Sequence, residues 1–116
     1  MIVLVVDDDA DTRETLRDFL EDEGYTVLVA ANGNDALQCV EHTRPDVMLL
    51  DLMMPLTSGN SVYEQLQKRP SLASIPILAV TAEPSRAPLG MPAIEKPVKL
   101  DRLLALVELC CEGSQR

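Results

Sequence analysis

The chain has 116 residues, 47% of them hydrophobic and 25% charged, which predicts one soluble globular domain over residues 1–116. Its net charge of −9 argues against direct binding to nucleic acid, because Lys and Arg side chains are needed to contact the phosphates. The sequence has neither the basic start of a signal peptide nor an apolar run long enough to cross a membrane, so we expect a cytoplasmic protein.

Two continuous apolar runs, Ile2–Val6 and Val47–Leu50, predict strands buried on both faces, as in parallel sheets. Further strands are predicted over 25–30, 77–80 and 92–94. Apolar residues at helical spacing predict four helices, from Asp11 to a stop near Gly24, over 35–43, around Val62 and Leu66 to about Arg69, and from Leu100 onward. This alternation predicts an α/β domain with a doubly wound, five-stranded parallel sheet and helices on both faces.

Polar residues follow four of the predicted strands at the point where each strand ends. Asp7 and Asp8 follow the first strand, Asp51 follows the third, Thr81 the fourth and Lys96 the fifth. In a sheet of strand order 2-1-3-4-5, the first and third strands are neighbours and flank the crevice in which ligands bind. We therefore expect all five side chains to meet in one crevice.

The chemistry of this set favours phosphoryl transfer. Three crowded carboxylates cannot all stay ionised without a cation, and their hard oxygen atoms suit Mg²⁺. Lys96 can pair with a phosphate oxygen and the Thr81 hydroxyl can donate to another. Because an aspartate carboxylate can accept a phosphoryl group, the residues predict a phosphoryl-accepting aspartate with a metal ion and a charge partner.

The chain resembles the receiver domain of two-component response regulators over essentially its full length. The matching segments, in the order of the family, are 5–9, 51–55 with Gly59, 81–82 and 96–97. The resemblance implies a flavodoxin-like fold, Asp51 as the phosphoacceptor, Thr81 as a switch hydroxyl and Lys96 as the phosphate partner. It also implies a Mg²⁺ site formed by Asp7, Asp8, Asp51 and the backbone carbonyl of Met53.

The same resemblance implies a function in a phosphorelay. The phosphoryl donor would be a phosphohistidine of a histidine kinase or of a histidine phosphotransfer protein. The domain would not be an enzyme for external substrates, and would catalyse only its own phosphorylation and a slow hydrolysis of the aspartyl phosphate. The output would pass to a downstream protein or to an effector domain outside these residues.

Two departures from the family pattern concern the output. The family commonly has an aromatic residue three positions before the lysine, and its ring turns inward on phosphorylation; here that position is Ala93. Only fourteen residues separate Thr81 from Lys96, fewer than is usual in the family. This segment contains Pro84, Pro88 and Pro92, which cannot lie inside a regular helix, so we expect the fourth helix of the family to be a single turn or a loop.

Two other functions stay open from the sequence. A Mg²⁺-dependent phosphatase of the haloacid-dehalogenase type would have a second acid two residues after the nucleophile, where this chain has Met53. A degenerate receiver that acts as a constitutive interaction module is the stronger alternative, because of Ala93 and the short segment. A dinucleotide-binding domain is disfavoured, since no glycine-rich loop follows the first strand.

The last helix raises the question of self-association. A helical wheel places Leu106 and Leu109 away from the core stripe of Leu100, Leu104 and Val107. Single exposed leucines are common on protein surfaces. The alternative is a dimer or partner surface on this helix.

Overall fold

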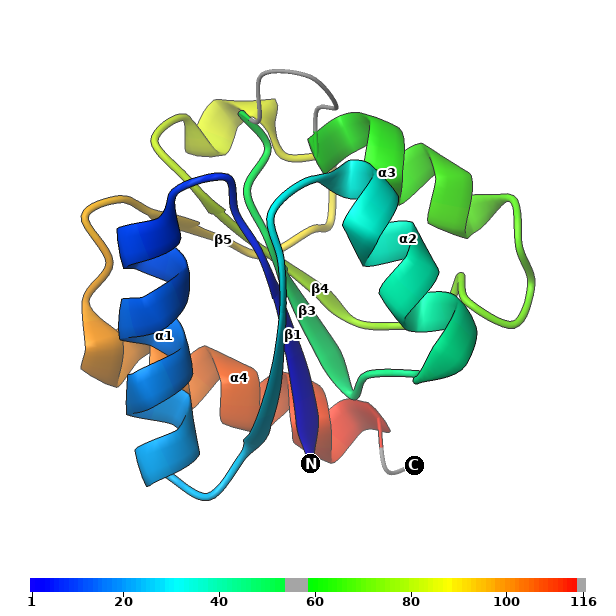
Figure 1. Cartoon of the computed structure of the whole chain (residues 1–116). Helices are drawn as coiled ribbons and strands as arrows, with labels where there is room; N and C mark the ends of the chain where they lie inside the picture. The colour runs from blue at the N-terminus through cyan, green and yellow to red at the C-terminus, as the bar shows by residue number, and fades with distance from the viewer. Residues whose placement is uncertain (54–58, 115–116) are drawn as a thin grey trace.

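The computed structural model describes residues 1–53 and 59–114 (Figure 1). Met54 and Pro55, at the end of the segment that follows the third strand, lie outside the described residues. The elements are β1 (Ile2–Val6), α1 (Ala10–Asp22), β2 (Thr26–Ala30), α2 (Gly33–His42), β3 (Val47–Leu50), α3 (Gly59–Gln67), β4 (Ile77–Thr81), the 3₁₀ turn η1 (Pro84–Arg86), β5 (Ala93–Glu95) and α4 (Leu100–Ser114). Within the described ranges, no helix combines the length and the apolar character needed to cross a bilayer.

The five strands form one parallel sheet in the order β2-β1-β3-β4-β5, as the sequence predicted. Helices α1 and α4 cover one face and helices α2 and α3 cover the other (Figure 1). Each face has its own buried cluster of aliphatic side chains. The predicted doubly wound α/β architecture is therefore confirmed.

Strand β1 shows why its sequence is continuously apolar. Leu4 and Val6 belong to the core under α2 and α3, whereas Val3 and Val5 belong to the core under α1 and α4. Successive side chains of a strand point to opposite faces, so a central strand covered on both sides needs an apolar residue at every position. Burial of each such side chain contributes about 1.5–3 kcal/mol relative to exposure.

The register of the sheet brings the strand ends together. Val6 of β1 lies opposite Leu50 of β3, so the residues that follow them, Asp7 and Asp51, leave the sheet side by side. The amide of Asp51 donates to the carbonyl of Val6 over 2.9 Å. At the other edge, the amide of Lys96 donates to the carbonyl of Thr81 over 2.9 Å, which extends the β4–β5 pairing to the lysine.

The segment between β4 and β5 contains one short turn of helix, η1, in agreement with the prediction of a single turn or a loop. The amide of Ala87 donates to the carbonyl of Pro84 over 3.1 Å, and this bond closes the turn. The proline at position 88 then prevents the turn from continuing, because proline supplies no backbone N–H.

Several element boundaries differ from the prediction by one or two residues. Helix α2 begins at Gly33 rather than at residue 35, because the Asn32 side chain caps the helix by accepting from the amide of Asp35 over 2.8 Å. Strand β5 begins at Ala93 rather than at Pro92, although the carbonyl of Pro92 still accepts from the Ala79 amide over 2.9 Å.

The core stripe of α4 is only partly the one predicted, since Leu100 and Val107 contact the core as expected. Leu106 was expected to face away from the core, but it is half-buried and packs against the cluster under α1 and α4 together with Leu103 and Val107. The sheet face is wide enough to contact the flank of the helix as well as its central stripe, which a helical wheel does not capture. Leu109 is 62% exposed, as predicted, and a dimer through this helix stays a prediction.

Candidate functional site

Asp7 and Asp51 are buried carboxylates at the carboxyl ends of the two central strands. Only 2% of Asp7 and 5% of Asp51 is exposed. Oδ1 of Asp7 accepts from the amide of Asp9 over 2.9 Å, and Oδ1 of Asp51 accepts from the amide of Met53 over 2.9 Å. In each case a backbone N–H of the following loop fixes the carboxylate, and Oδ2 is left for another partner.

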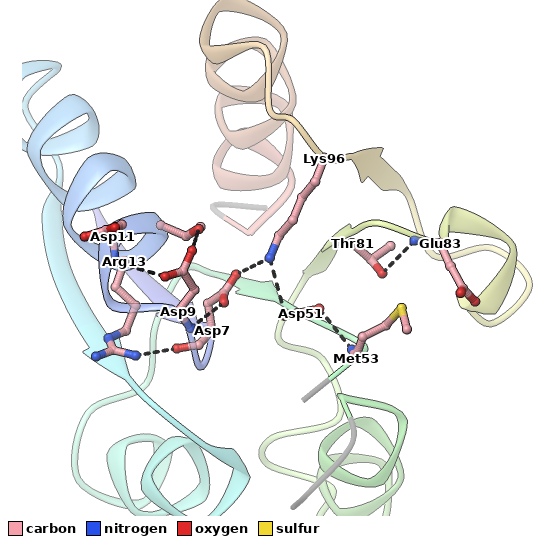
Figure 2. Close-up of polar contacts among 10 residues, drawn as sticks. Asp7, Asp9, Asp11, Arg13, Asp51, Met53, Thr81, Glu83 and Lys96 are labelled. Atoms are coloured by element: carbon pink, nitrogen blue, oxygen red, sulfur yellow. Dashed lines mark hydrogen bonds and ion pairs between the residues drawn. The ribbon is translucent and has the colours of Figure 1, made fainter. Parts of the chain in front are cut away.

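That partner is Lys96, which reaches across from the end of β5 (Figure 2). Its Nζ lies 2.7 Å from Oδ2 of Asp7 and 3.4 Å from Oδ2 of Asp51. Burial alone would lower the pKa of Lys96, but the hydrogen bond and charge of Asp7 and the charge of Asp51 outweigh burial and raise that pKa above its ordinary value. The ammonium group is therefore charged throughout the physiological pH range.

Asp8 completes a cluster of three carboxylates. One ligand atom from each of Asp7, Asp8 and Asp51 can be chosen so that all three lie within 4.8 Å of one another, and Asp8 is exposed. Three acidic side chains share this site with one lysine, and the exposed Asp8 opens the cluster to water. Hard oxygen ligands beside solvent fit Mg²⁺, which keeps several water molecules when a protein binds it.

The predicted fourth metal ligand, the backbone carbonyl of Met53, belongs to the residue whose amide already binds Asp51. This places the Met53 backbone beside the cluster (Figure 2). Its assignment as a metal ligand stays a prediction.

Thr81 ends β4 and is fully buried. Its hydroxyl oxygen accepts from the amide of Glu83 over 3.1 Å (Figure 2). The hydroxyl is thus held toward the β4–η1 loop, while the backbone carbonyl of Thr81 binds the amide of Lys96. Thr81 therefore ends the strand next to β3, the strand that Asp51 follows, as its position in the sequence predicted.

Ala93, where the resemblance implies an aromatic residue, lies in β5 opposite Ala79 of β4. It is half-buried and packs against the cluster under α2 and α3. A methyl group at this position has no ring that could change its orientation.

Two residues that stabilise the β1–α1 loop were not identified from the sequence. Asp9 caps α1: its carboxylate accepts from the amide of Asp11 over 3.3 Å and from the hydroxyl of Thr12 over 2.7 Å. The hydrogen bond from Thr12 lowers the pKa of Asp9. An aspartate just before a helical segment is a usual capping signal, so the sequence did contain a clue.

The second unpredicted residue is Arg13, in the first turns of α1. Its Nη1 donates to the backbone carbonyl of Asp7 over 2.7 Å (Figure 2). This contact depends on where one long side chain points, and no spacing in the sequence indicates it.

Comparison with known proteins places the chain in a family. Residues 3–108 match the model of the response regulator receiver domain. The chain is 42% identical over 110 residues to the response regulator MprA of Mycobacterium ulcerans, a match that covers 89% of this chain and 47% of MprA. It is 37% identical over 118 residues to an uncharacterized 14.6 kDa protein of Leptolyngbya boryana, covering 96% of this chain and 90% of that protein. The chain thus spans about half the length of the MprA proteins that it matches.

Solved structures agree with this match. The signal receiver domain of a signal transduction histidine kinase from Syntrophus aciditrophicus has a TM-score of 0.89 and 30% identity, covering 99% of this chain and 92% of that one. The response regulator TrrA of Thermotoga maritima, solved in complex with Mg²⁺ and BeF, has a TM-score of 0.83 and 31% identity, covering 94% of this chain and 97% of that one. The chain belongs to the family of response regulator receiver domains.

Proposed function

We propose that the chain is a phosphorylation-dependent signalling domain in which Asp51 accepts a phosphoryl group from the phosphohistidine of a histidine kinase or a histidine phosphotransfer protein. The observation that carries this proposal is the buried carboxylate of Asp51, which lies 3.4 Å from the Lys96 ammonium group and within a cluster of three carboxylates. Both charges are held at the open end of the sheet, where a donor can approach.

In the proposed reaction, a carboxylate oxygen of Asp51 attacks the phosphorus atom of the phosphohistidine. The bond between phosphorus and the imidazole nitrogen breaks, and that nitrogen keeps the electron pair. The donor ring carries a proton on its other nitrogen before the transfer, so it leaves as neutral imidazole, and Asp51 becomes an aspartyl phosphate.

The neighbouring residues would stabilise the transferred group. Lys96 exchanges its contact with Asp51 for a phosphoryl oxygen, while its shorter contact with Asp7 keeps the ammonium group in position. The hydroxyl of Thr81 leaves the amide of Glu83 and donates to a second phosphoryl oxygen. Asp7, Asp8, Asp51 and the carbonyl of Met53 would hold Mg²⁺, which would supply positive charge to offset the charge on the phosphoryl group.

We propose that this chemistry is limited to the domain itself. Phosphatases of the haloacid-dehalogenase type have a second acid two residues after the nucleophile, and Met53 at that position has no carboxylate to act as a general acid. The expected activities are therefore autophosphorylation and a slow hydrolysis of the aspartyl phosphate by water.

The signal would pass to a downstream protein or to an effector domain. The MprA proteins are about twice as long as this chain, which supports an effector beyond the receiver in that group. The 14.6 kDa relative is of nearly the same length, which supports a separate downstream protein. The net charge of −9 supports an output through protein contacts rather than nucleic acid.

Phosphorylation of the protein can be tested with acetyl phosphate and Mg²⁺, followed by intact mass spectrometry. The wild type is expected to gain one phosphoryl group, and Asp51→Asn is expected to gain none. Asp46→Asn is a matched control at the opposite end of β3, where Asp46 accepts from the amide of Ile2 over 2.6 Å. Labelling of Asp51→Asn equal to that of Asp46→Asn would refute the assignment of Asp51.

A degenerate receiver that serves as a constitutive interaction module is the second candidate, and Ala93 is the observation that favours it. This alternative predicts that the wild type gains no phosphoryl group. If phosphorylation does occur, amide hydrogen exchange with and without beryllofluoride tests the output. The fixed turn η1 and the small Ala93 side chain predict only modest changes in protection across residues 82–95.

A further inference from the structure

Arg13 of α1 is the one basic residue, among those described, that binds the backbone of the loop carrying Asp7 and Asp8. Its Nη1 lies 2.7 Å from the carbonyl oxygen of Asp7, and its side chain is half-buried between α1 and the loop. A hydrogen bond from a charged guanidinium group is stronger than one between neutral groups. The contact therefore fixes the peptide group that joins Asp7 to Asp8.

This peptide group determines where the Asp8 carboxylate lies. The Asp7 carboxylate itself is held by Lys96 over 2.7 Å and by the amide of Asp9 over 2.9 Å. Asp8 is exposed, and no hydrogen bond connects its carboxylate to another of the described residues. Its position beside the two buried carboxylates depends on the backbone on either side of it.

The residue that follows Asp8 is Asp9, which caps α1. The peptide group that precedes Asp8 is bound by Arg13. Both contacts come from the start of α1. The helix therefore acts as a rigid support for the loop, and the arginine is the part of that support that binds the peptide group preceding Asp8.

We infer that Arg13 is a positioning residue that sets the Mg²⁺ affinity of the site by holding the peptide between Asp7 and Asp8. The inference rests on the proposed function for its biological meaning. Removal of Arg13 affects the Mg²⁺ affinity in two ways that have opposite signs. Removal of a positive charge near three carboxylates would by itself favour binding of a cation, whereas loss of the hydrogen bond disfavours it by releasing Asp8.

Arg17 offers a matched control on the same helix, four residues further along. It forms a surface pair with Glu21, with 3.8 Å between Nε and Oε1, and its side chain is 40% exposed. Arg17→Met removes the same charge as Arg13→Met and leaves the loop contact intact. Because the chain has no tryptophan, binding of Mg²⁺ should be followed by isothermal calorimetry rather than by indole fluorescence.

Arg13→Met is expected to weaken Mg²⁺ binding by about tenfold, the low end of the range for residues that support metal ligands. Arg17→Met is expected to bind as tightly as the wild type or slightly more tightly. Arg13→Lys keeps the positive charge and a donor group, so its Mg²⁺ affinity is expected to lie between those of the wild type and Arg13→Met. If Arg13→Met does not fold, Arg13→Lys replaces it in the comparison. The rate of phosphorylation at saturating Mg²⁺ should change much less than the Mg²⁺ concentration at half-saturation.

A second readout needs neither metal nor phosphoryl donor. In Mg²⁺-free protein, the amide of Asp9, which donates to Asp7, is expected to exchange with solvent faster in Arg13→Met than in Arg17→Met. Equal Mg²⁺ affinity and equal Asp9 exchange in these two variants would overturn the inference. A wild type that binds Mg²⁺ but gains no phosphoryl group would instead refute the proposed function and leave the positioning effect measurable.

Discussion

Removal of the Lys96 ammonium group provides a quantitative test of the site. Lys96→Met keeps most of the side-chain volume but leaves the carboxylates of Asp7 and Asp51 without their cation, and the side chains of these two residues are only 2% and 7% exposed. Removing one partner of a fully buried ion pair costs about 3–5 kcal/mol. Because 25% of the Lys96 side chain is exposed, water can partly replace it. We expect a loss of about 2–3 kcal/mol in the free energy of unfolding.

This loss should be measured in the absence of divalent metal. Urea unfolding in EDTA, followed by far-ultraviolet circular dichroism, gives the free energy, and thermal unfolding should show a decrease of about 8–12 °C in Tm. Lys99→Met is the matched control, since Lys99 is exposed and three residues away, and its effect should stay within about 0.5 kcal/mol. Added Mg²⁺ should stabilise Lys96→Met more than the wild type, because it neutralises the carboxylates that the lysine no longer contacts.

The pH dependence of the difference has a definite sign. The pKa of Lys96 is raised in the folded protein, so its stabilisation is fully present below the unfolded value of 10.5 and is lost as the pH rises through the higher folded value. As far as Lys96 is concerned, the stability difference between the wild type and Lys96→Met should be constant between about pH 7 and 9. If Lys96→Met and Lys99→Met unfold at the same urea concentration in EDTA, the electrostatic argument for the site is refuted.

Three further changes test other parts of the structure. Asp9→Ala should lower the free energy of unfolding at pH 7, because it removes the side chain that caps α1. Because the pKa of Asp9 is lowered in the folded protein, this loss should shrink as the pH falls below 3.8, whereas a pH-independent loss would contradict a charged cap. Asp51→Asn should raise Tm in EDTA, since it removes one of two neighbouring buried carboxylates. The same variant should gain less stability from added Mg²⁺ than the wild type does. A lower Tm in EDTA would argue against repulsion between Asp7 and Asp51. Leu103→Ala should lower the free energy of unfolding in urea by about 2–5 kcal/mol, because Leu103 is buried. Leu109→Ala, at an exposed position, should lower it by less than about 0.5 kcal/mol. Equal losses would contradict the burial of the α4 stripe.

The arrangement of the site was predictable because it follows from backbone topology. A strand buried on both faces has a continuous apolar sequence, so the acids after Val6 and Leu50 could be assigned to strand ends. The parallel order then required Asp7 and Asp51 to be neighbours, and the structure shows them both in contact with Lys96. Such reasoning needs only the positions of residues along strands.

The residues that the sequence did not predict are those whose effect depends on side-chain direction or on the width of a packed surface. Arg13 could equally have extended into solvent from its helix, and only its conformation links it to the carbonyl of Asp7. Leu106 lies at the flank of α4, where burial depends on how closely the helix lies on the sheet. Neither property is encoded in the spacing of residue types.

The contact between Lys96 and Asp7 joins residues that are 89 positions apart in the chain, and the contact with Asp51 spans 45 positions. Each of these contacts closes a long loop of the chain, and the entropy lost in closing that loop offsets part of the stabilisation that the contact provides. Lys96 follows β5, an edge strand of three residues whose one neighbour among the described strands is β4. The acids follow central strands that pair on both sides, whereas the lysine follows one short edge strand, so the charge balance of the site depends on the pairing of β5. A partner that binds or pulls on β5 would thereby change the electrostatic potential at Asp51 from a distance, without contacting the aspartate.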